Sequence, residues 1–316
     1  MNINTHIQKV YPELIKMGKT KLNIVVSCVS NKTKTPLPSL QFRNIELDNI
    51  PKMGEKWINF LKASNAPLTP AYQLYSGAAW NSILDAEELS KNLKNYEVNW
   101  YIMSVGYGLL KWEEPIKPYS ITFSKPSFDG LRKRVLKQEA NRLWWDYIIN
   151  RRNFKISDIA TPDFTTIVVG STEYINAVRE DLEGCNNLLI ISSTYNARYF
   201  VDRQIQTHEK LRFIVGGGKI DNNARNLKFI LHHIDQWGVD LDVINTNLKG
   251  IISGIKEELP KVNRNRKSLS KDKAINIIKS TGLNKPMSHY VNTIRNERGY
   301  KISEQVIISY LQELKK

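Results

Sequence analysis

Cysteine is scarce in this sequence of 316 residues: Cys28 and Cys185 are the only two, and they lie far apart. Two distant cysteines make no disulfide framework, and with five scattered histidines they fit no metal-ligand spacing, so we expect neither a metal centre nor a cofactor. Residues 1–21 are polar and charged, so we expect no secretory leader. No apolar run approaches the ~20 residues that a membrane span requires. These absences favour a cytoplasmic protein that does not enter a membrane.

Acidic side chains are also few, since 31 Asp and Glu stand against 46 Lys and Arg and leave a formal net charge of +15. Residues 261–316 carry 13 Lys and Arg but 4 Asp and Glu, and residues 131–155 carry 8 basic and 2 acidic side chains. Each phosphate neutralised by such a cluster releases condensed counterions, so the clustering favours a polyanionic partner. We predict double-stranded DNA as that partner; the sequence identifies no protein partner.

Five short runs of β-branched, aliphatic and aromatic residues predict buried strands. The runs lie at residues 22–27, 100–104, 166–170, 188–192 and 211–215. They do not alternate between apolar and polar residues, as expected of strands that are covered on both faces of a parallel sheet. Helical patterns lie between or after them, at residues 77–94, 130–150, 172–182 and 222–236. This order predicts an α/β domain with an open, mostly parallel sheet flanked by helices.

The length leaves room for a second, small domain at the carboxyl end of the chain. We predict an α/β domain over residues 1–260, a basic linker over residues 261–272, and a helical unit over residues 273–316. In the last of these, apolar spacing indicates three helices with a short strand at residues 299–302 before the third. The pattern predicts a helix-turn-helix with a short wing. The alternative is a basic helical cap on the α/β domain.

Small and hydroxyl-bearing residues follow several of the predicted strands. Ligands of open parallel sheets bind beyond the carboxyl ends of the strands, where residues 28–32, 105–108 and 170–174 would lie. Such residues suit close backbone approach to an anionic or sugar-like ligand. Residues 216–219 resemble a phosphate-binding loop, but they lack the spacing of nucleotide hydrolases. We therefore expect the amides of this loop to meet a DNA phosphate.

Two side chains near the first strand and two in the basic stretch each have two interpretations. Cys28 is either a nucleophile or a small buried thiol, and Lys32 either meets a ligand or is a solvated surface lysine. Trp144 and Trp145 lie among arginines, as in proteins that stack bases. Helical spacing places apolar residues around them, so we expect one tryptophan in the core and the other exposed.

Four motifs within residues 22–125 resemble those of the YaaA-like bacterial domains. They are Ser27-Cys28 followed by Lys32, then Leu74-Tyr75-Ser76-Gly77, then Trp100-Tyr101-Ile102-Met103-Ser104 with Tyr107-Gly108-Leu109-Leu110, and finally Pro118-Tyr119. Two residues depart from the family pattern, since Val105 replaces an alanine and Ser120 stands where an aspartate is frequent. The family's carboxylate is therefore not carried over to position 120.

The YaaA-like domains are similar to the uracil-DNA-glycosylase superfamily. Members of that superfamily hold a flipped base beyond the strand ends of an α/β sheet, and a catalytic Asp or Asn follows their first strand. Asn31 stands at that kind of position here. At the level of domain type, the chain also resembles the Brig-type anti-phage DNA glycosylases, which remove a hypermodified cytosine from phage DNA. These resemblances imply a DNA glycosylase that acts in anti-phage defence and leaves an abasic site.

The glycosylase hypothesis assigns roles to named side chains. Asn31 would orient water, Lys32 would bind phosphate or form a Schiff base, and Glu173 would activate water or contact the sugar. The other pocket candidates are Cys28, Ser30, Tyr75, Ser76, Trp80, Ser104, Tyr107, Tyr119 and Ser171. The side chains expected to bind DNA are Arg132, Lys133, Arg134, Arg142, Arg151, Arg152, Lys219, Arg264, Arg266, Lys267, His289, Asn292, Arg295 and Arg298.

Two other functions are compatible with the same sequence. A non-enzymatic DNA-binding protein, such as a stress or regulatory factor, explains the charge equally well. It does not explain why polar residues gather at so many strand ends. A base-exchange transglycosylase acting on RNA would instead form a covalent sugar adduct through Cys28 or Glu173.

Overall fold

The computed structural model describes residues 19–124, 127–135, 139–192, 200–216, 218, 220–255, 267–282, 290, 293–294, 300–301 and 304–314. The chain forms two compact units, Met1–Lys256 and Glu257–Lys316. In the part of the chain that is described, no helix is both long enough and apolar enough to cross a membrane.

The first unit is built on a six-stranded sheet with the order β4-β3-β1-β6-β7-β8. Neighbouring strands are parallel except β3 and β4, which pair antiparallel at one edge. The strands are β1 (Thr20–Ser27), β3 (Tyr96–Ser104), β4 (Gly108–Lys111), β6 (Phe164–Val169), β7 (Leu188–Ser192) and β8 (Gln204–Gln206). The prediction of an α/β fold with a mostly parallel sheet flanked by helices is therefore confirmed.

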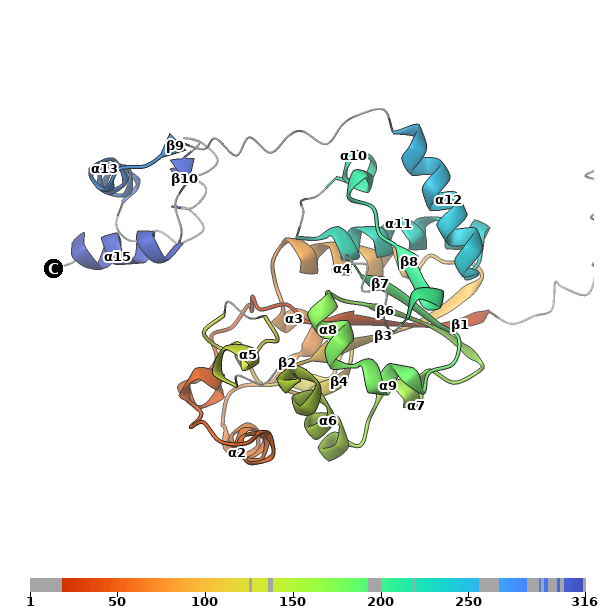
Figure 1. Cartoon of the computed structure of the whole chain (residues 1–316), viewed down its shortest axis with the longest axis horizontal. Coiled ribbons are helices and arrows are strands. Elements are labelled where there is room, and N and C mark those ends of the chain that lie inside the picture. The colour runs from red at the N-terminus through yellow and green to blue at the C-terminus, as the bar shows by residue number, and fades with distance from the viewer. Residues whose placement is uncertain are drawn as a thin grey trace, which may run out of the picture. The chain divides into compact units, whose positions relative to one another are not determined.

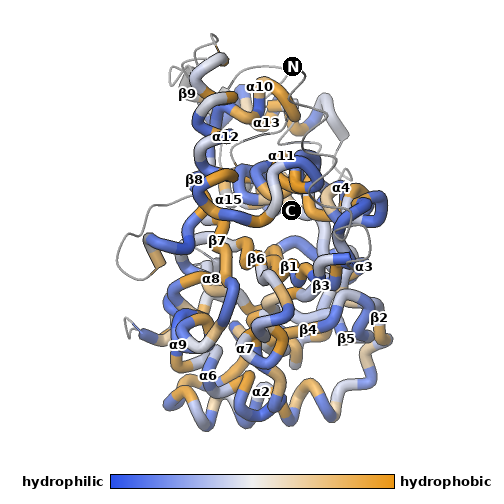
Figure 2. The backbone as a smooth tube through the Cα atoms, turned by 90° about the vertical axis from the view of Figure 1, so that its right-hand side faces the viewer, coloured by the Kyte–Doolittle hydropathy of each residue, from blue (hydrophilic) through white to orange (hydrophobic). Residues whose placement is uncertain are grey.

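The central strands are buried on both of their faces. In β1 the five consecutive residues 22–26 are buried, and four of them, Leu22, Ile24, Val25 and Val26, are apolar. Because successive side chains of a strand point to opposite faces, a continuous buried run requires cover on both sides. Figure 2 shows hydrophobic residues concentrated along β1, β6 and β7, whereas the helices around them mix hydrophobic and hydrophilic residues.

Helices form a layer on each side of the sheet (Figure 1). α4 (Ala78–Ser90) and α11 (Asn222–Trp237) lie on one face, and α2 (Ile50–Ala63), α6 (Ala140–Arg152) and α8 (Thr172–Ala177) lie on the other.

Trp144 and Trp145 of α6 are both fully buried. The indole N–H of Trp144 donates to the Val105 carbonyl at 2.7 Å. Neither tryptophan therefore offers the exposed stacking face that we expected of one of them.

From the central pair β1 and β6, the chain adds strands toward both edges of the sheet: the strand that follows β1 pairs on one side, and the strand that follows β6 pairs on the other. From β1 it passes through α4 to β3, and from β6 it passes through α8 and α9 (Arg179–Glu183) to β7. α4, which leads into β3, and α8, which follows β6, lie on opposite faces of the sheet (Figure 1), and the order of strands along the chain reverses between β1 and β6. This is the topological switch point at which parallel α/β sheets bind their ligands.

The fifth predicted strand, residues 211–215, is wrong. These residues end the 3-10 helix η5 (Glu209–Leu211) and form α10 (Arg212–Val215), and the outermost parallel strand is β8. Within the run only Leu211 is buried and Ile214 is exposed, so the segment is not covered on both faces. The sequence pattern misses β8 because its one buried residue, Ile205, lies between two glutamines.

Three of the predicted helical patterns match α4, α11 and the neighbouring pair α8 and α9, whereas the fourth matches α5 (Leu131–Arg134) and α6. Two long helices were not predicted, α2 and α12 (Leu241–Gly254). The short elements of the unit are η2 (Pro38–Leu40), η3 (Phe42–Asn44), β2 (Thr69–Pro70), α3 (Ala71–Leu74), β5 (Pro115–Ile116), α7 (Ile156–Ile159) and η4 (Val201–Arg203).

The second unit has a small core of its own. α13 (Lys271–Thr281) and α15 (Glu304–Leu314) contribute to it, and its buried residues are Ala274, Ile277, Ile278, Tyr290, Ile294 and Ile307. β9 (Lys267–Ser268) pairs in parallel with β10 (Tyr300–Lys301), so β9 and the start of α13 fall within the segment predicted to be a linker. Most of the predicted second helix lies outside the described residues, and the helix-turn-helix stays a prediction.

Candidate functional site

A pocket of about 350 Å³ lies at the switch point, beyond the carboxyl ends of β1 and β6. We call it the switch-point pocket. The loop after β1 forms one wall, the starts of α4 and α11 form a second, and the start of α8 forms a third. Its lining residues are Ser27, Cys28, Val29, Ser30, Asn31, Ser76, Gly77, Ala78, Ala79, Ile83, Thr122, Ser124, Val169, Ser171, Tyr174, Ile220, Asn223 and Ala224.

The loop after β1 is held in place by backbone hydrogen bonds on both of its sides. The Cys28 N–H donates to the Met103 carbonyl of β3 at 3.0 Å. Further along, the Ser76 N–H donates to the Asn31 carbonyl at 3.1 Å, and the Thr33 N–H donates to the Leu74 carbonyl at 2.8 Å. These hydrogen bonds hold the loop between β3 and the segment that leads into α4.

Asn31 stands at the mouth of the switch-point pocket, close to Gly77. Gly77 has a φ of 104°, a conformation that favours glycine. A Cβ atom at Gly77 would lie 3.3 Å from the Asn31 side-chain nitrogen. The Asn31 side chain is exposed, and its amide has no hydrogen-bond partner among the described residues. It is therefore free to bind water or a ligand.

None of the described residues that line the switch-point pocket is charged. The lining combines hydroxyl, amide and thiol groups with small apolar side chains. Bringing a charged group into such a site without a counterion would cost free energy, whereas a neutral group with several hydrogen-bonding atoms would be bound readily. The chemistry of the described lining thus favours a neutral, polar ligand over a charged one.

Behind the pocket, four phenol, thiol and alcohol groups form a buried hydrogen-bonded chain. The Tyr119 hydroxyl lies 2.9 Å from that of Tyr75, 2.7 Å from the Ser104 hydroxyl and 3.6 Å from the Cys28 sulfur. Burial raises the pKa of Tyr75 and of Tyr119 well above the usual value. Both tyrosines are therefore neutral hydrogen-bonding groups at physiological pH.

Lys32 lies in the same region but does not line the switch-point pocket. Its ammonium group donates to the carbonyls of Val29 at 2.8 Å and Ser30 at 3.2 Å. It also lies 5.1 Å from the ring centre of Tyr75 and 4.8 Å from that of Tyr119. Burial lowers the pKa of Lys32, since removal from water disfavours its charged form.

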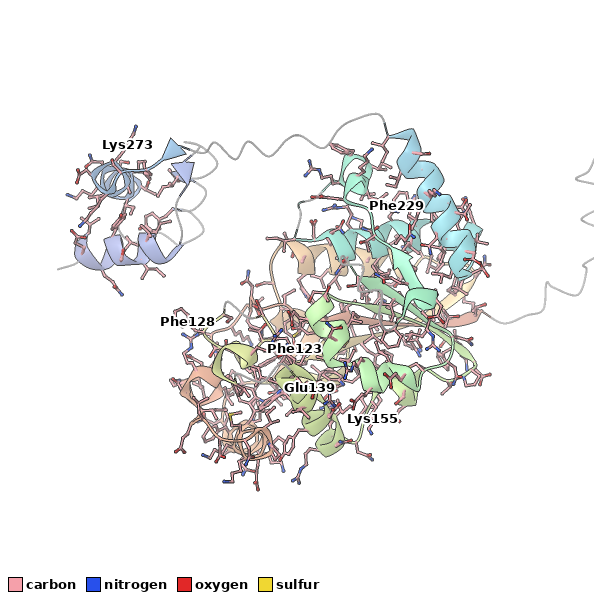
Figure 3. The ribbon with its side chains drawn as sticks, viewed as in Figure 1. Phe123, Phe128, Glu139, Lys155, Phe229 and Lys273 are labelled. Carbon is pink, nitrogen blue, oxygen red and sulfur yellow. The ribbon has the colours of Figure 1, made fainter. Side chains whose placement is uncertain are left out.

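Glu173, predicted to act on water or sugar, is bound by neighbouring side chains instead of facing the pocket. Its carboxylate accepts hydrogen bonds from Arg132 at 3.3 Å and from Asn141 at 3.4 Å. The residues on either side in α8 do reach the pocket, because Ser171 and Tyr174 line it. Tyr174 also packs against Phe123, whose ring lies 5.1 Å away and which Figure 3 labels beside α8.

The predicted pocket residues separate into two groups. Cys28, Ser30, Ser76 and Ser171 line the switch-point pocket together with Asn31. The other five do not line it, and they are buried or partly buried: Tyr75, Trp80, Ser104, Tyr107 and Tyr119. Sequence reasoning missed Thr122, Ser124 and Asn223, because these residues come from a loop and a helix distant in sequence, and no motif marks them.

Tyr107 belongs to a different cavity, of about 630 Å³, between α2 and α6. Its hydroxyl donates to the Lys117 carbonyl at 3.1 Å and accepts from the Lys117 N–H at 3.0 Å. Burial raises the pKa of Tyr107 to about 12. Arg151 and Arg152, both predicted to bind DNA, also line this cavity.

Most of the predicted DNA-binding arginines of the first unit form intramolecular ion pairs. Arg132 pairs with Glu173, Arg142 with Glu139, Asp146 and Glu180, and Arg152 with Glu114. Arg151 instead lies over the ring of Tyr147, 5.4 Å from its centre. The structure describes the backbone of Lys133, Arg134 and Lys267 but not their side chains. The remaining predicted residues lie outside the described part of the chain: Lys219, Arg264, Arg266, His289, Asn292, Arg295 and Arg298.

A carboxylate lies beside Ser120, the position at which the family pattern has an aspartate. The Ser120 hydroxyl donates to Asp129 at 2.7 Å, and the Arg43 backbone N–H donates to the same carboxylate at 2.8 Å. Burial opposes ionisation of Asp129, but the hydrogen bonds from Arg43 and Ser120 outweigh it and lower the pKa. Asp129 thus fixes the segment that carries Thr122 and Ser124 into the pocket wall.

The part of the chain that is described contains no cluster of three or more His, Cys, Asp or Glu side chains that could hold a metal ion. No protein-family model matches the chain, and the comparison with curated proteins likewise gives no match.

Proposed function

We propose that the protein is a DNA glycosylase that hydrolyses the bond between a modified base and its deoxyribose. The observation that carries this proposal is the switch-point pocket, a crevice of about 350 Å³ with Asn31 at its mouth and no charged side chain among the lining residues that the structure describes. A base rotated out of a duplex is neutral, rich in hydrogen-bonding atoms and held in a snug pocket by such enzymes. Hypermodified cytosine of phage DNA is the substrate favoured by the sequence resemblance, with anti-phage defence as the role.

The polar groups of the pocket suit the chemistry of this reaction. The bond to the base breaks with a cation-like sugar, water then adds to the anomeric carbon, and the released proton goes to the departing base or to solvent. The reaction of such a cation depends more on where the attacking water is placed than on how basic that water is. The Asn31 amide can hold that water, while hydroxyl donors such as Ser30 and Ser171 can stabilise the negative charge that develops on the departing base.

The basic residues outside the pocket would supply the affinity for DNA. The 13 Lys and Arg of residues 261–316 exceed the arginines of α6 in number, and those of α6 are largely engaged in ion pairs. Phosphate contacts position a protein on a duplex but carry little sequence information. We therefore assign binding of the duplex mainly to the carboxyl-terminal residues and choice of the base to the switch-point pocket.

A second candidate is base exchange on RNA through a covalent intermediate. The observation that favours it is the Cys28 thiol, which lines the switch-point pocket and could attack a sugar carbon. Glu173, the other nucleophile considered, is bound to Arg132 and does not line the pocket. Cys28 is thus the residue on which a covalent adduct is expected if this candidate is correct.

The test incubates the full-length protein with unmodified DNA, uracil-containing DNA and phage DNA that carries hypermodified cytosine. Mass spectrometry detects free base and any adduct on the protein, and alkali treatment reveals abasic sites. Free base with alkali-labile sites in the modified DNA supports the glycosylase. A protein adduct on incubation with RNA supports base exchange, and binding without release of base from any substrate supports a non-enzymatic DNA-binding protein.

A further inference from the structure

The proposed function leaves the role of Lys32 to be explained, because this lysine does not line the switch-point pocket. Residues 27–31, which precede it, all do. An amine that formed a Schiff base with the sugar or bound its phosphate would have to reach the ligand. The ammonium group of Lys32 is instead directed at the backbone of its own loop.

The contacts of Lys32 close a small ring within the loop. Its ammonium group donates to the carbonyl of Val29 at 2.8 Å and to that of Ser30 at 3.2 Å, both on the amino-terminal side of Asn31. On the carboxyl-terminal side, the backbone of Lys32 pairs with that of Tyr75 in an antiparallel bridge. The two sets of contacts bracket Asn31 and restrict the backbone that carries it.

The aromatic rings beneath this loop fix the position of the ammonium group. Lys32 lies over Tyr75 and Tyr119 at distances at which a cation is attracted to the face of a ring. The hydroxyls of those two tyrosines are 2.9 Å apart, and Tyr119 is also joined to Ser104 at the end of β3. The ammonium group of Lys32 is therefore held against tyrosines that are joined to β3, and this contact also holds the loop that carries Lys32.

We propose that Lys32 is a positioning residue, whose ammonium group holds the Val29–Ser30 backbone so that Asn31 faces the switch-point pocket. The inference rests on the proposed function for its catalytic consequence, but the structural part can be measured without any catalysis. It assigns to Lys32 neither a bond to the sugar nor a contact with phosphate. Loss of the ammonium group should loosen the loop and leave the affinity for DNA unchanged.

Cys28 provides a direct measure of loop order. It lies in the same loop, lines the pocket and is 5% exposed, whereas the second cysteine, Cys185, is buried elsewhere in the unit. In Lys32→Met, alkylation of Cys28 by iodoacetamide should be faster by about tenfold or more, because hydrogen bonds to a charged donor are among the stronger ones. Cys185 should react as slowly as in the unchanged protein, which would exclude global unfolding.

Lys34→Met is the matched control. Its ammonium group donates to the Thr69 hydroxyl at 2.8 Å and makes no contact with the carbonyls of Val29 and Ser30. The same substitution two residues further along should leave the labelling of Cys28 unchanged. If Lys32→Met does not fold, Lys32→Gln, which also lacks the cation, should give the same separation between the labelling of Cys28 and Cys185.

DNA binding and base release complete the experiment on the full-length chain. Lys32→Met should lower the single-turnover rate of base release by about tenfold or more while the Kd for DNA and its salt dependence stay the same. The proposal is overturned by unchanged labelling of Cys28, by weaker DNA binding with a smaller salt slope, or by a DNA adduct on Lys32 after borohydride treatment. Faster Cys28 labelling without base release from any DNA would support the positioning role and contradict the glycosylase.

Discussion

The sulfur of Cys28 lies 3.2 Å from the hydroxyl oxygen of Tyr174, and both groups are buried in the wall of the switch-point pocket. The contact joins the loop after β1 to α8, which follows β6. Burial raises the pKa of Tyr174 well above its usual value, so the hydroxyl is neutral. A pocket wall that holds such a neutral hydroxyl suits the neutral base that we propose as ligand.

Removal of the Tyr174 hydroxyl tests the importance of that contact for the fold. Tyr174→Phe should lower the free energy of unfolding by about 1 kcal/mol, because a buried hydrogen bond is lost. Urea denaturation measures the change. The control is Tyr96→Phe, since the Tyr96 hydroxyl has no hydrogen-bond partner among the residues the structure describes, and its effect should stay within about 0.5 kcal/mol. Equal losses in the two variants would contradict the prediction.

A methyl group at Gly77 should displace Asn31. Gly77→Ala places a Cβ 3.3 Å from the Asn31 side-chain nitrogen and forces alanine to adopt a φ of 104°. We expect it to lower the free energy of unfolding by about 1–3 kcal/mol and to slow base release by about tenfold or more. Thermal denaturation and single-turnover assays measure the two effects.

Gly250→Ala is the opposite case and serves as its control. Gly250 lies inside α12, and a Cβ there would meet no heavy atom within 4 Å. Alanine should raise the free energy of unfolding by about 0.5–1 kcal/mol. Base release should not change. If Gly77→Ala behaved like Gly250→Ala, Gly77 would have no part in holding Asn31.

Asp146 should make the protein less stable as the pH rises through the weakly acidic range. Burial, followed by the charge of Glu180, raises the pKa of Asp146 to about 6. The folded state therefore keeps a proton that the unfolded state has lost above about pH 4, and stability falls as the pH rises from about 4 to about 6. Asp146→Asn removes this loss. The free energy of unfolding of the variant, relative to that of the wild type, should therefore rise by about 2–3 kcal/mol between pH 4 and pH 6, since one pKa unit corresponds to about 1.4 kcal/mol.

Urea denaturation at a series of pH values measures the difference between the two proteins. Asp202→Asn is the control, because its side chain is 83% exposed and the substitution should leave the pH dependence unchanged. A difference between Asp146→Asn and wild type that is the same at pH 4 and pH 6 would show that Asp146 ionises in the folded state as it does in the unfolded state.

Deletion of residues 261–316 should weaken DNA binding without changing which base is chosen. These residues carry a net charge of +9, and neutralised phosphates dominate the salt dependence of DNA affinity. We expect a higher Kd and a shallower dependence of log Kd on log salt, measured by fluorescence anisotropy. The ranking of substrates in base-release assays should be preserved. A changed ranking would mean that the carboxyl-terminal residues take part in base recognition.

The sequence predicts the centre of the fold better than its edges. β1 and β7 are evident because continuous apolar runs such as Ile24-Val25-Val26 have to be covered on two faces. The edge strand β8 holds one buried residue, Ile205, and only its pairing with β7 makes it a strand. Residues 211–215 have the composition of a strand, but no neighbouring strand pairs with them.

The same division applies to the candidate site. Asn31, Ser30 and Ser171 follow strands directly, so the rule that ligands bind at the carboxyl ends of parallel strands is enough to find them. Thr122 and Asn223 reach the pocket only because a loop and the start of α11 fold over it. The direction of a side chain is also set by tertiary contacts, as with Glu173, which Arg132 and Asn141 bind.

Release of free base by Asn31→Ala tests the central claim most directly. The substrate is a duplex with the modified base, in single-turnover conditions, and the released base is measured by mass spectrometry. The control is Asn81→Ala, an exposed amide of α4 that does not line the switch-point pocket. We predict that Asn81→Ala releases base at the wild-type rate and that Asn31→Ala is slower by about 10²-fold, with unchanged DNA affinity. Full activity of Asn31→Ala would contradict the account.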